Sequence, residues 1–295
     1  MDKKPIIALM YDFDKTLITN NMQNFGFIPS LGISEGEFWG AVEEFTRENE
    51  MDGLLSYMYF MLKYANSRDI KITREEFVKL GKGIEFFPGV EEWFKRINEY
   101  AEEKGAVVEH YVISSGLQEI IEGSSVYKNF TKTFACEFAY DVNGVAIWPK
   151  TVVNFTTKTQ YLFRINKGQL SVRDDEALNS YMSEADRRIP FKNMIYIGDG
   201  FTDVPCMKLC KMNGGHSIAV YDKCTDIANK LMREERIDFM AKADYRDNTE
   251  LDTIVKAVID KILAEHKLAL YITKDVKKLN FECRKRQKTF QSLMD

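Results

Sequence analysis

The stretch that decides the fold lies near the N-terminus and reads IIALMYDFDKT from Ile6 to Thr16. Its apolar part, Ile6–Tyr11, is typical of a strand buried on both faces of a parallel sheet. Similar apolar runs follow at Val107–Ile113, Asn193–Ile197 and Ser217–Val220. The first two of these end, like Ile6–Tyr11, in polar residues. Because open α/β sheets bind ligands at the carboxyl ends of their strands, this pattern predicts a functional site at that edge.

Two carboxylates, Asp12 and Asp14, directly follow the first apolar run. Side chains alternate along a strand, so these two point the same way if the extended geometry continues. Neighbouring carboxylates repel in a protein interior, and a divalent cation relieves the repulsion; hard oxygen ligands favour Mg²⁺. A carboxylate can also attack phosphorus to give an acyl phosphate, while a second one acts as general acid and base. A pair of turn or capping aspartates is the structural alternative.

A second acidic motif follows the run Asn193–Ile197. Asp199 lies between Gly198 and Gly200, which permit a tight turn, and Asp203 comes four residues later. Asp199 supplies a further hard ligand, and Asp203 reaches the same site if a helical turn begins at Phe201. A loop aspartate that caps the next helix is the structural alternative.

Two weaker signals point to phosphate. Ser114, Ser115 and Gly116 follow the second run, where a hydroxyl and backbone N–H groups at a helix N-terminus form a phosphate cradle. Lys158 stands at a predicted helix start, just after Thr156-Thr157. An ammonium is disfavoured there by the helix dipole, but it is useful if it reaches a phosphoryl group or pairs with Asp12.

Together these motifs resemble those of the haloacid dehalogenase superfamily of phosphohydrolases. The match is to the phosphoserine phosphatase-like branch, with a helical cap inserted after the first motif. The resemblance implies an α/β fold with a Rossmann-like parallel sheet, and Mg²⁺ as cofactor. It implies that Asp12 is the nucleophile and a metal ligand, and that Asp14 is the acid/base, with its backbone carbonyl on the metal. The remaining implied roles are phosphoryl binding by Ser114 and Lys158, metal binding by Asp199, and support of the metal site by Asp203.

The sequence departs from the family pattern or leaves it open at several positions. Lys15 stands where Gly is frequent. Ser115 competes with Ser114, and Lys150 or Lys167 with Lys158, for the same roles. Asp14-Lys15-Thr16 also resembles the phosphorylated Asp-Lys-Thr of P-type ATPases, which would make Asp14 the nucleophile. We reject that register because no run has the length of a membrane span and because Asp12 directly follows the strand.

The resemblance divides the chain into a discontinuous core and an insert. We expect residues 1–17 and 87–270 to form the catalytic core, residues 18–86 a helical cap, and residues 271–295 a basic tail. Within the cap, Glu37–Thr46 and Met51–Tyr64 have helical patterns, and Thr73 caps a third helix. Gly81 and Gly83 are candidate hinge residues beside the return to the core.

Turn signals and periodicity predict further elements of the core. Asn143-Gly144 between apolar segments indicates a hairpin of Phe134–Tyr140 with Val145–Trp148. Asp174–Arg188 reads as a polar helix and Thr249–His266 as an amphipathic one.

The composition bounds the partners of the protein. Lys and Arg number 41 against 45 Asp and Glu, giving a net charge of −4, which provides no general attraction to nucleic acid or membrane. The chain has no apolar run of signal-peptide or membrane-span length, and its five cysteines are irregularly spaced, which favours reduced thiols. We therefore expect a cytoplasmic protein with neither a nucleic-acid nor a membrane partner.

These observations favour a Mg²⁺-dependent phosphomonoesterase that acts on a small phosphorylated metabolite through an aspartyl phosphate. A phosphotransferase or mutase of the same superfamily is the enzymatic alternative, and a catalytically silent phosphate-binding protein is the other. Arg47, Lys63 and Arg68 of the cap are candidate anion-reading residues. The substrate and the oligomeric state are left open.

Overall fold

The computed structural model describes residues 4–291, with side chains as far as residue 272 and at residues 274 and 275. Within this part of the chain, seven strands form one sheet in the order β4-β3-β2-β1-β5-β6-β7. The strands are β1 (Ile6–Tyr11), β2 (Val107–Leu117), β3 (Lys132–Tyr140), β4 (Ala146–Thr151), β5 (Met194–Gly198), β6 (His216–Tyr221) and β7 (Phe239–Lys242). Only β4, which pairs with β3, is antiparallel to its neighbour among them. The expected α/β class with a Rossmann-like parallel sheet is confirmed.

The strand order places the start of the chain at the centre of the sheet. From β1 the chain moves to β2, β3 and β4 on one side, and it later returns to β5, β6 and β7 on the other. Tyr11, the last residue of β1, is in register with Val112 of β2 and with Ile197 of β5. Residues that follow these three strands therefore meet at one edge, at the point where the strand order reverses.

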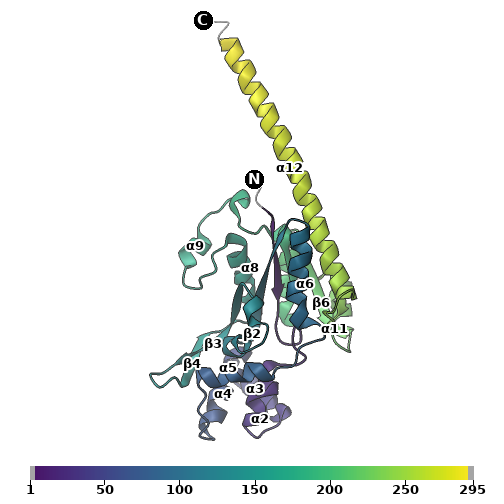
Figure 1. Cartoon of the computed structure of the whole chain (residues 1–295). Helices are drawn as coiled ribbons and strands as arrows, with labels where there is room; N and C mark the ends of the chain where they lie inside the picture. The colour runs from purple at the N-terminus through teal and green to yellow at the C-terminus, as the bar shows by residue number, and fades with distance from the viewer. Residues whose placement is uncertain (1–3, 292–295) are drawn as a thin grey trace.

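Helices cover both faces of the sheet (Figure 1). On one face, α6 packs against β2, and α12 packs against α6 and β7; on the other, α10 packs against α8, β5 and β6. The bounds of the helices outside the insert are α6 (Val90–Glu103), α7 (Gln118–Glu122), α8 (Lys158–Lys167), α9 (Asp175–Asn179), α10 (Val204–Met212), α11 (Asp226–Arg233) and α12 (Glu250–Gln291). Apolar side chains from both layers and from the central strands are fully buried between them.

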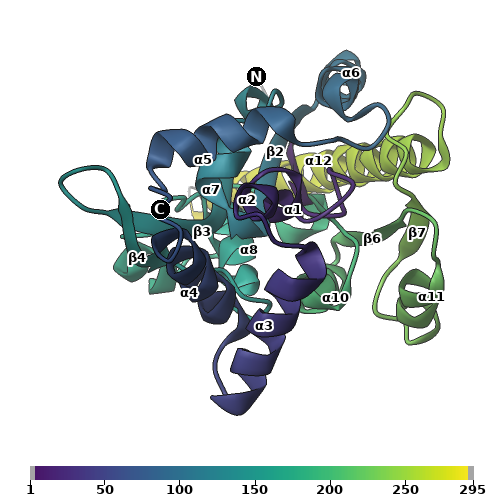
Figure 2. The ribbon, with the colours of Figure 1, turned by 90° about the horizontal axis from the view of Figure 1, so that it is seen from below.

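The insert between β1 and α6 is helical. Its helices are α1 (Met22–Phe25), α2 (Phe27–Ser30), α3 (Glu35–Glu48), α4 (Gly53–Asn66) and α5 (Arg74–Leu80). Seen from below, they lie across one end of the sheet (Figure 2). A capping box at Ser34 starts α3, and the side chains of Asp52 and Thr73 accept backbone N–H groups at the starts of α4 and α5. The expected helices of this segment and the hairpin of β3 with β4 are present.

Two expectations for the core were wrong, and one strand was missed. The polar segment Asp174–Arg188 forms only the short α9 and a single 3₁₀ turn, Glu184–Asp186. Ser114, Ser115 and Gly116 do not follow β2 but lie within it, at a register shift against β3 between Ile113 and Leu117. The strand β7 was not foreseen, because its run Phe239–Lys242 is short and partly exposed.

The helix expected at Thr249–His266 is much longer in the structure. It continues as α12 through Gln291 and extends well beyond the rest of the molecule (Figure 1). The expected basic tail, residues 271–295, is therefore a continuation of this helix up to Gln291, and its last residues lie outside the described range. No helix among the described residues is long and apolar enough to span a membrane.

Candidate active site

The backbone at the end of β1 brings two of the expected aspartates together. The amide N–H of Asp12 donates to the carbonyl oxygen of Ile197, 2.9 Å away, which extends the pairing of β1 with β5 by one residue. Asp199 lies two residues after Ile197 and directly follows β5. The first carboxylate after one central strand therefore faces the first carboxylate after its neighbour.

Lys158 lies between Asp12 and Asp203. Its Nζ is 3.0 Å from Asp12 Oδ1 and 2.7 Å from Asp203 Oδ1, and its side chain is 0% exposed. Tyr196 of β5 donates its hydroxyl to the same oxygen of Asp203, at 2.8 Å. The other oxygen of Asp203 accepts the backbone N–H of Asp199 at 3.2 Å and that of Gly200 at 3.4 Å. Asp203 thus fixes both the lysine and the loop that carries Asp199.

The start of α8 positions Lys158. The side-chain oxygen of Asn154 accepts the backbone N–H groups of Thr156 and Thr157, at 3.2 and 2.9 Å. Asn154, rather than the two threonines, therefore caps this turn, which is a common role for Asn before a helix. The Nδ2 of Asn154 also donates to Asp52 Oδ2 at the start of α4, 3.1 Å away, which ties the lysine-bearing helix to the insert.

Asp14 points at the insert. Its Oδ1 accepts the backbone N–H of Met22, the first residue of α1, at 3.0 Å. Gly116 of β2 lies against the same two residues, because a Cβ at this position would overlap the end of the Met22 side chain and come 3.2 Å from Asp14 Oδ2. Glycine at position 116 therefore leaves room for the Met22 side chain, which would have to move if residue 116 carried a Cβ.

The two serines of β2 have different surroundings. Ser115 donates its hydroxyl to the carbonyl oxygen of Val153 at 2.8 Å, and its own carbonyl accepts the hydroxyl of Tyr57 from α4 at 2.9 Å. Ser114 is fully buried, and its Oγ accepts the N–H of Gly116 at 3.0 Å, which leaves its hydroxyl hydrogen available. Ser114 is the better placed of the two to contact a ligand.

The other lysines considered lie away from the aspartates. Lys150 forms a surface ion pair with Glu137 at 2.7 Å. Lys167 donates to the backbone oxygens of Leu178 and Ser180. Of the three, only Lys158 contacts Asp12.

The carboxylates present a donor set of the kind that suits a hard cation. One oxygen from each of Asp12, Asp199 and Asp203 lies within 4.8 Å of the other two. Oxygen donors at this spacing fit Mg²⁺, although Asp203 already uses both of its oxygens within the protein. Asp14, whose backbone carbonyl was expected on the metal, adds no side-chain oxygen to this group, since its Oδ1 accepts the backbone N–H of Met22.

Crowding and burial perturb these carboxylates. Burial raises the pKa of Asp12 to about 6 although Lys158 lowers it. Burial and the charge of Asp12 raise the pKa of Asp14 to about 7, and burial together with Asp203 and Asp12 raises that of Asp199 to about 8. Burial alone would lower the pKa of Lys158, but Asp12 and Asp203 outweigh it and raise that pKa. The lysine is held as a cation, while the carboxylates favour protons or a metal ion.

The family model for haloacid dehalogenase-like hydrolases matches residues 9–208. This range includes all the expected site residues, from Asp12 to Asp203. The chain belongs to the haloacid dehalogenase-like hydrolase family. An uncharacterized protein of Borreliella burgdorferi is 30% identical over 277 residues, with 85% of this chain and 95% of that protein covered.

Solved structures of the family share the fold. A family hydrolase from Salmonella enterica serovar Typhi superposes with a TM-score of 0.55 at 17% identity, covering 88% of this chain and 73% of that one. A substrate-bound phosphoserine phosphatase gives a TM-score of 0.55 at 17% identity, covering 86% and 99%. A phosphoserine phosphatase with an analogue of the phospho-aspartyl intermediate gives 0.52 at 16% identity, with the same coverage. The expected resemblance to the phosphoserine phosphatase-like branch is thus matched in the fold.

Several contacts of this haloacid dehalogenase-like site were missed from the sequence. Tyr196 lies inside an apolar run and gave no polar signal. Tyr57 and Met22 meet the site only through tertiary packing of the insert. Asn154, three residues before Thr157, is the exception, because an Asn at that offset from a helix start is a recognisable cap.

Proposed function

We propose that this protein is a Mg²⁺-dependent phosphomonoesterase that acts on a small phosphorylated metabolite through a phospho-aspartate on Asp12. One observation carries the proposal: Asp12, Asp14, Ser114, Lys158 and Asp199 converge at the carboxyl edge of the three central strands. The membership of the chain in a hydrolase family supports the same reading.

The contacts of Asp12 suit a nucleophile. Lys158 and the backbone N–H of Phe13, 2.8 Å away, both contact Oδ1, so Oδ2 is the oxygen left to attack phosphorus. Attack forms an Asp12 Oδ2–P bond and breaks the bond from phosphorus to the ester oxygen. Lys158 and the Ser114 hydroxyl would hold the phosphoryl oxygens during this step, as fixed donors do in other phosphoryl-transfer sites.

Asp14 is suited to move the proton. With a pKa raised to about 7, it is partly protonated near neutral pH and can donate to the leaving ester oxygen. The resulting carboxylate then takes a proton from the water that cleaves the acyl phosphate. The hydrogen bond from the Met22 N–H to Oδ1 leaves Oδ2 for this transfer.

Asp12 and Asp199 would hold the metal ion together with the backbone carbonyl of Asp14, and Asp203 would support the site through Lys158 and the Asp199 loop. When bound, Mg²⁺ offsets the negative charge of the phosphoryl group beside these carboxylates.

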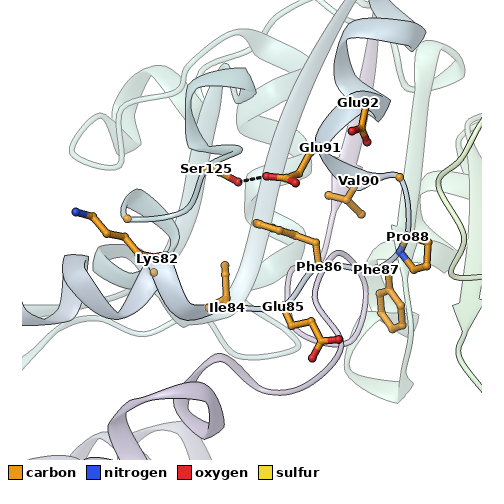
Figure 3. Close-up of a pocket in the computed structure, with 13 residues that line it drawn as sticks. Lys82, Ile84, Glu85, Phe86, Phe87, Pro88, Val90, Glu91, Glu92 and Ser125 are labelled. Carbon is orange, nitrogen blue, oxygen red and sulfur yellow. Dashed lines mark hydrogen bonds between the residues drawn. The ribbon is translucent and has the colours of Figure 1, made fainter.

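We also propose that residues 18–86 act as a cap over this site. Tyr57 bonds Ser115, Met22 bonds Asp14, and Asp52 bonds Asn154, so the insert contacts the catalytic edge at three places. Such a lid excludes bulk water and large substrates. The segment that returns to the core runs beside a cavity of about 700 Å³, in which Ser125 donates to Glu91 (Figure 3).

Phosphate release from p-nitrophenyl phosphate with Mg²⁺ tests the proposal. Asp12→Asn should abolish turnover, whereas Asp14→Asn should still form a phospho-enzyme slowly, and the exposed Asp186→Asn is the matched control. EDTA should remove the activity. Full turnover by Asp12→Asn, or in a metal-free preparation, contradicts the mechanism. Transfer to an added alcohol in preference to water would identify a phosphotransferase instead, and phosphate binding without any turnover would identify a silent protein.

A further inference from the structure

A small cavity is lined in part by Asp199, and Lys158 is not among its lining residues. It has a volume of about 310 Å³ and lies among the loops that follow β1, β5 and β6. Lys15 and Lys223 line it together with Asp199. A liquid water molecule takes about 30 Å³, so the space holds about ten non-hydrogen atoms, enough for a short carbon chain that ends in an anionic group.

Lys15 has an unusual backbone conformation for its residue type. Its φ is +55°, in the left-handed region, which costs a residue with a side chain about 1 kcal/mol and costs glycine nothing. The cost falls directly between Asp14 and Thr16, at the mouth of the site. Backbone strain of this kind is concentrated at functional positions, where the side chain has a use.

The two ammonium groups are free to bind a ligand. Among the described residues, neither Lys15 nor Lys223 forms an ion pair or hydrogen bond. The charge of Lys15 nevertheless acts on the site, because it lowers the raised pKa values of Asp14 and Asp199. Asp222 also lines the cavity, and its carboxylate would repel an anion placed beside it.

Among the described residues, the hydrogen bonds from the cap to the catalytic edge come from no cation. Lys63 lies over the ring of Phe60 at 4.9 Å, and Arg68 lies over the ring of Tyr64 at 5.0 Å. The cap groups that reach the catalytic edge are the Tyr57 hydroxyl, the Met22 backbone and the Asp52 carboxylate. Hence a second negative charge on a substrate would meet its complement in the cavity rather than under the cap.

We propose that Lys15 and Lys223 select the substrate, and that this substrate is a compact phosphomonoester with a second anionic group, a carboxylate or a phosphate. The second group lies in the cavity while the reacting phosphate lies at Asp12. Val220, Phe87 and Ala228 give the cavity buried apolar walls that suit the short carbon chain between the two groups. This inference rests on the proposed phosphatase function.

Steady-state phosphate release with Mg²⁺ tests the proposal on three probes that share a three-carbon chain. Glycerol 3-phosphate has no second anion, 3-phosphoglycerate has a carboxylate, and 1,3-propanediol bisphosphate has a second phosphate. At least one of the two probes with a second anionic group should exceed glycerol 3-phosphate in kcat/KM by about 10- to 100-fold, as a charge-assisted hydrogen bond provides. Which probe is preferred identifies the second group; equal kcat/KM for all three overturns the proposal.

Substitutions locate the selectivity. Lys15→Gln and Lys223→Gln should each lower the ratio of kcat/KM between the preferred probe and glycerol 3-phosphate by about 10-fold. Lys15→Gly removes both the charge and the strain, so a similar loss in Lys15→Gln and Lys15→Gly assigns the effect to the charge. Lys230→Gln is the matched control, since Lys230 lies over the ring of Phe201 and does not line the cavity. A ratio unchanged in all the Lys15 and Lys223 variants overturns the proposal.

A binding measurement separates this inference from the proposed function. Calorimetry with Mg²⁺ and Asp12→Asn protein should show tighter binding of the preferred probe than of glycerol 3-phosphate, and Lys15→Gln in that background should remove the difference. Absence of turnover by the wild-type protein, with this difference in binding intact, defeats the phosphatase proposal alone. Equal affinities defeat the specificity site alone.

Discussion

Replacement of Lys158 by Met is the sharpest single test of the site, because this one cation separates two buried carboxylates. Its Nζ lies 3.0 Å from Asp12 and 2.7 Å from Asp203. Without it, oxygens of these two carboxylates remain within 4.8 Å of each other. At an effective dielectric constant of about 20, two charges at that distance repel by about 3.5 kcal/mol. Mutational data on buried ion pairs put the cost of removing one partner at about 3–5 kcal/mol.

The measurement is urea unfolding in EDTA, followed with and without Mg²⁺. With a slope of about 3 kcal/mol/M, a loss of 3–5 kcal/mol lowers the midpoint by roughly 1–1.7 M. Mg²⁺ should restore part of the loss, because a divalent cation at the same carboxylates replaces some of the missing charge. Turnover should fall by roughly 100-fold or more, as when a fixed donor to a transition-state oxyanion is removed.

Lys150→Met is the matched control. Lys150 is 52% exposed and its ion pair with Glu137 is on the surface, so its loss should cost less than about 1 kcal/mol and leave turnover unchanged. If Lys158→Met unfolds at the same urea concentration as Lys150→Met, the two buried ion pairs do not carry the charge balance argued for them. Lys158→Arg, which keeps the charge but changes its shape, should fold better than Lys158→Met.

Three further outcomes follow from the geometry. In EDTA the free energy of unfolding should fall as the pH rises from about 5.5 to 8.5, because Asp199 has a pKa of about 8 in the folded state against 3.8 in the unfolded state. Mg²⁺ should reverse this fall. Thermal unfolding across this pH range checks the prediction, and a rise of stability with pH refutes it. Tyr57→Phe removes the hydrogen bond to Ser115 and should cost about 1 kcal/mol and lower kcat/KM several-fold, whereas the exposed Tyr59→Phe should do neither. Gly81→Ala places a methyl group against the backbone of Ile120 and Gly123 and should destabilise the fold by more than 1 kcal/mol by urea unfolding, whereas Gly83→Ala, in open space, should cost well under that.

Much of the fold was predictable because its strands are apolar runs that end in catalytic-type residues. Ile6–Tyr11 was placed correctly from its lack of polar alternation, and the Asn143-Gly144 turn identified the hairpin of β3 with β4. The helix predicted at Asp174–Arg188 was wrong because this segment has helix propensity but no apolar face to bury. Only the short α9 and a 3₁₀ turn form there. β7 was missed because four residues carry too little pattern to stand out.

The site was predictable at its ligands but not at their supports. Asp12 and Asp199 stand directly after strands, and parallel pairing alone brings such residues together. The partners of Asp203 and Asp14 depend on packing, since Tyr196 lies in an apolar run and Met22 contacts Asp14 through its backbone N–H, which carries no sequence signal. Gly81 has a packing role that its sequence position did not reveal. Its φ is −60°, and a Cβ at this position would overlap the backbone of Ile120 and Gly123, so glycine permits close packing of the insert against α7.

The charge balance of the site indicates that the attraction for a phosphorylated substrate comes from positive charges outside the carboxylate cluster. Asp12, Asp14, Asp199 and Asp203 bring four carboxylates together against the single buried cation Lys158. A divalent cation and one proton on Asp14 would leave this cluster neutral, and a phosphate dianion would then enter without net attraction. Any pull on the substrate must come from outside the cluster. The N-terminus of α8 supplies part of it, and Lys15, held beside Asp14 in a left-handed conformation, supplies a full charge. A glycine at position 15 would relieve the backbone but leave the mouth of the site without that charge.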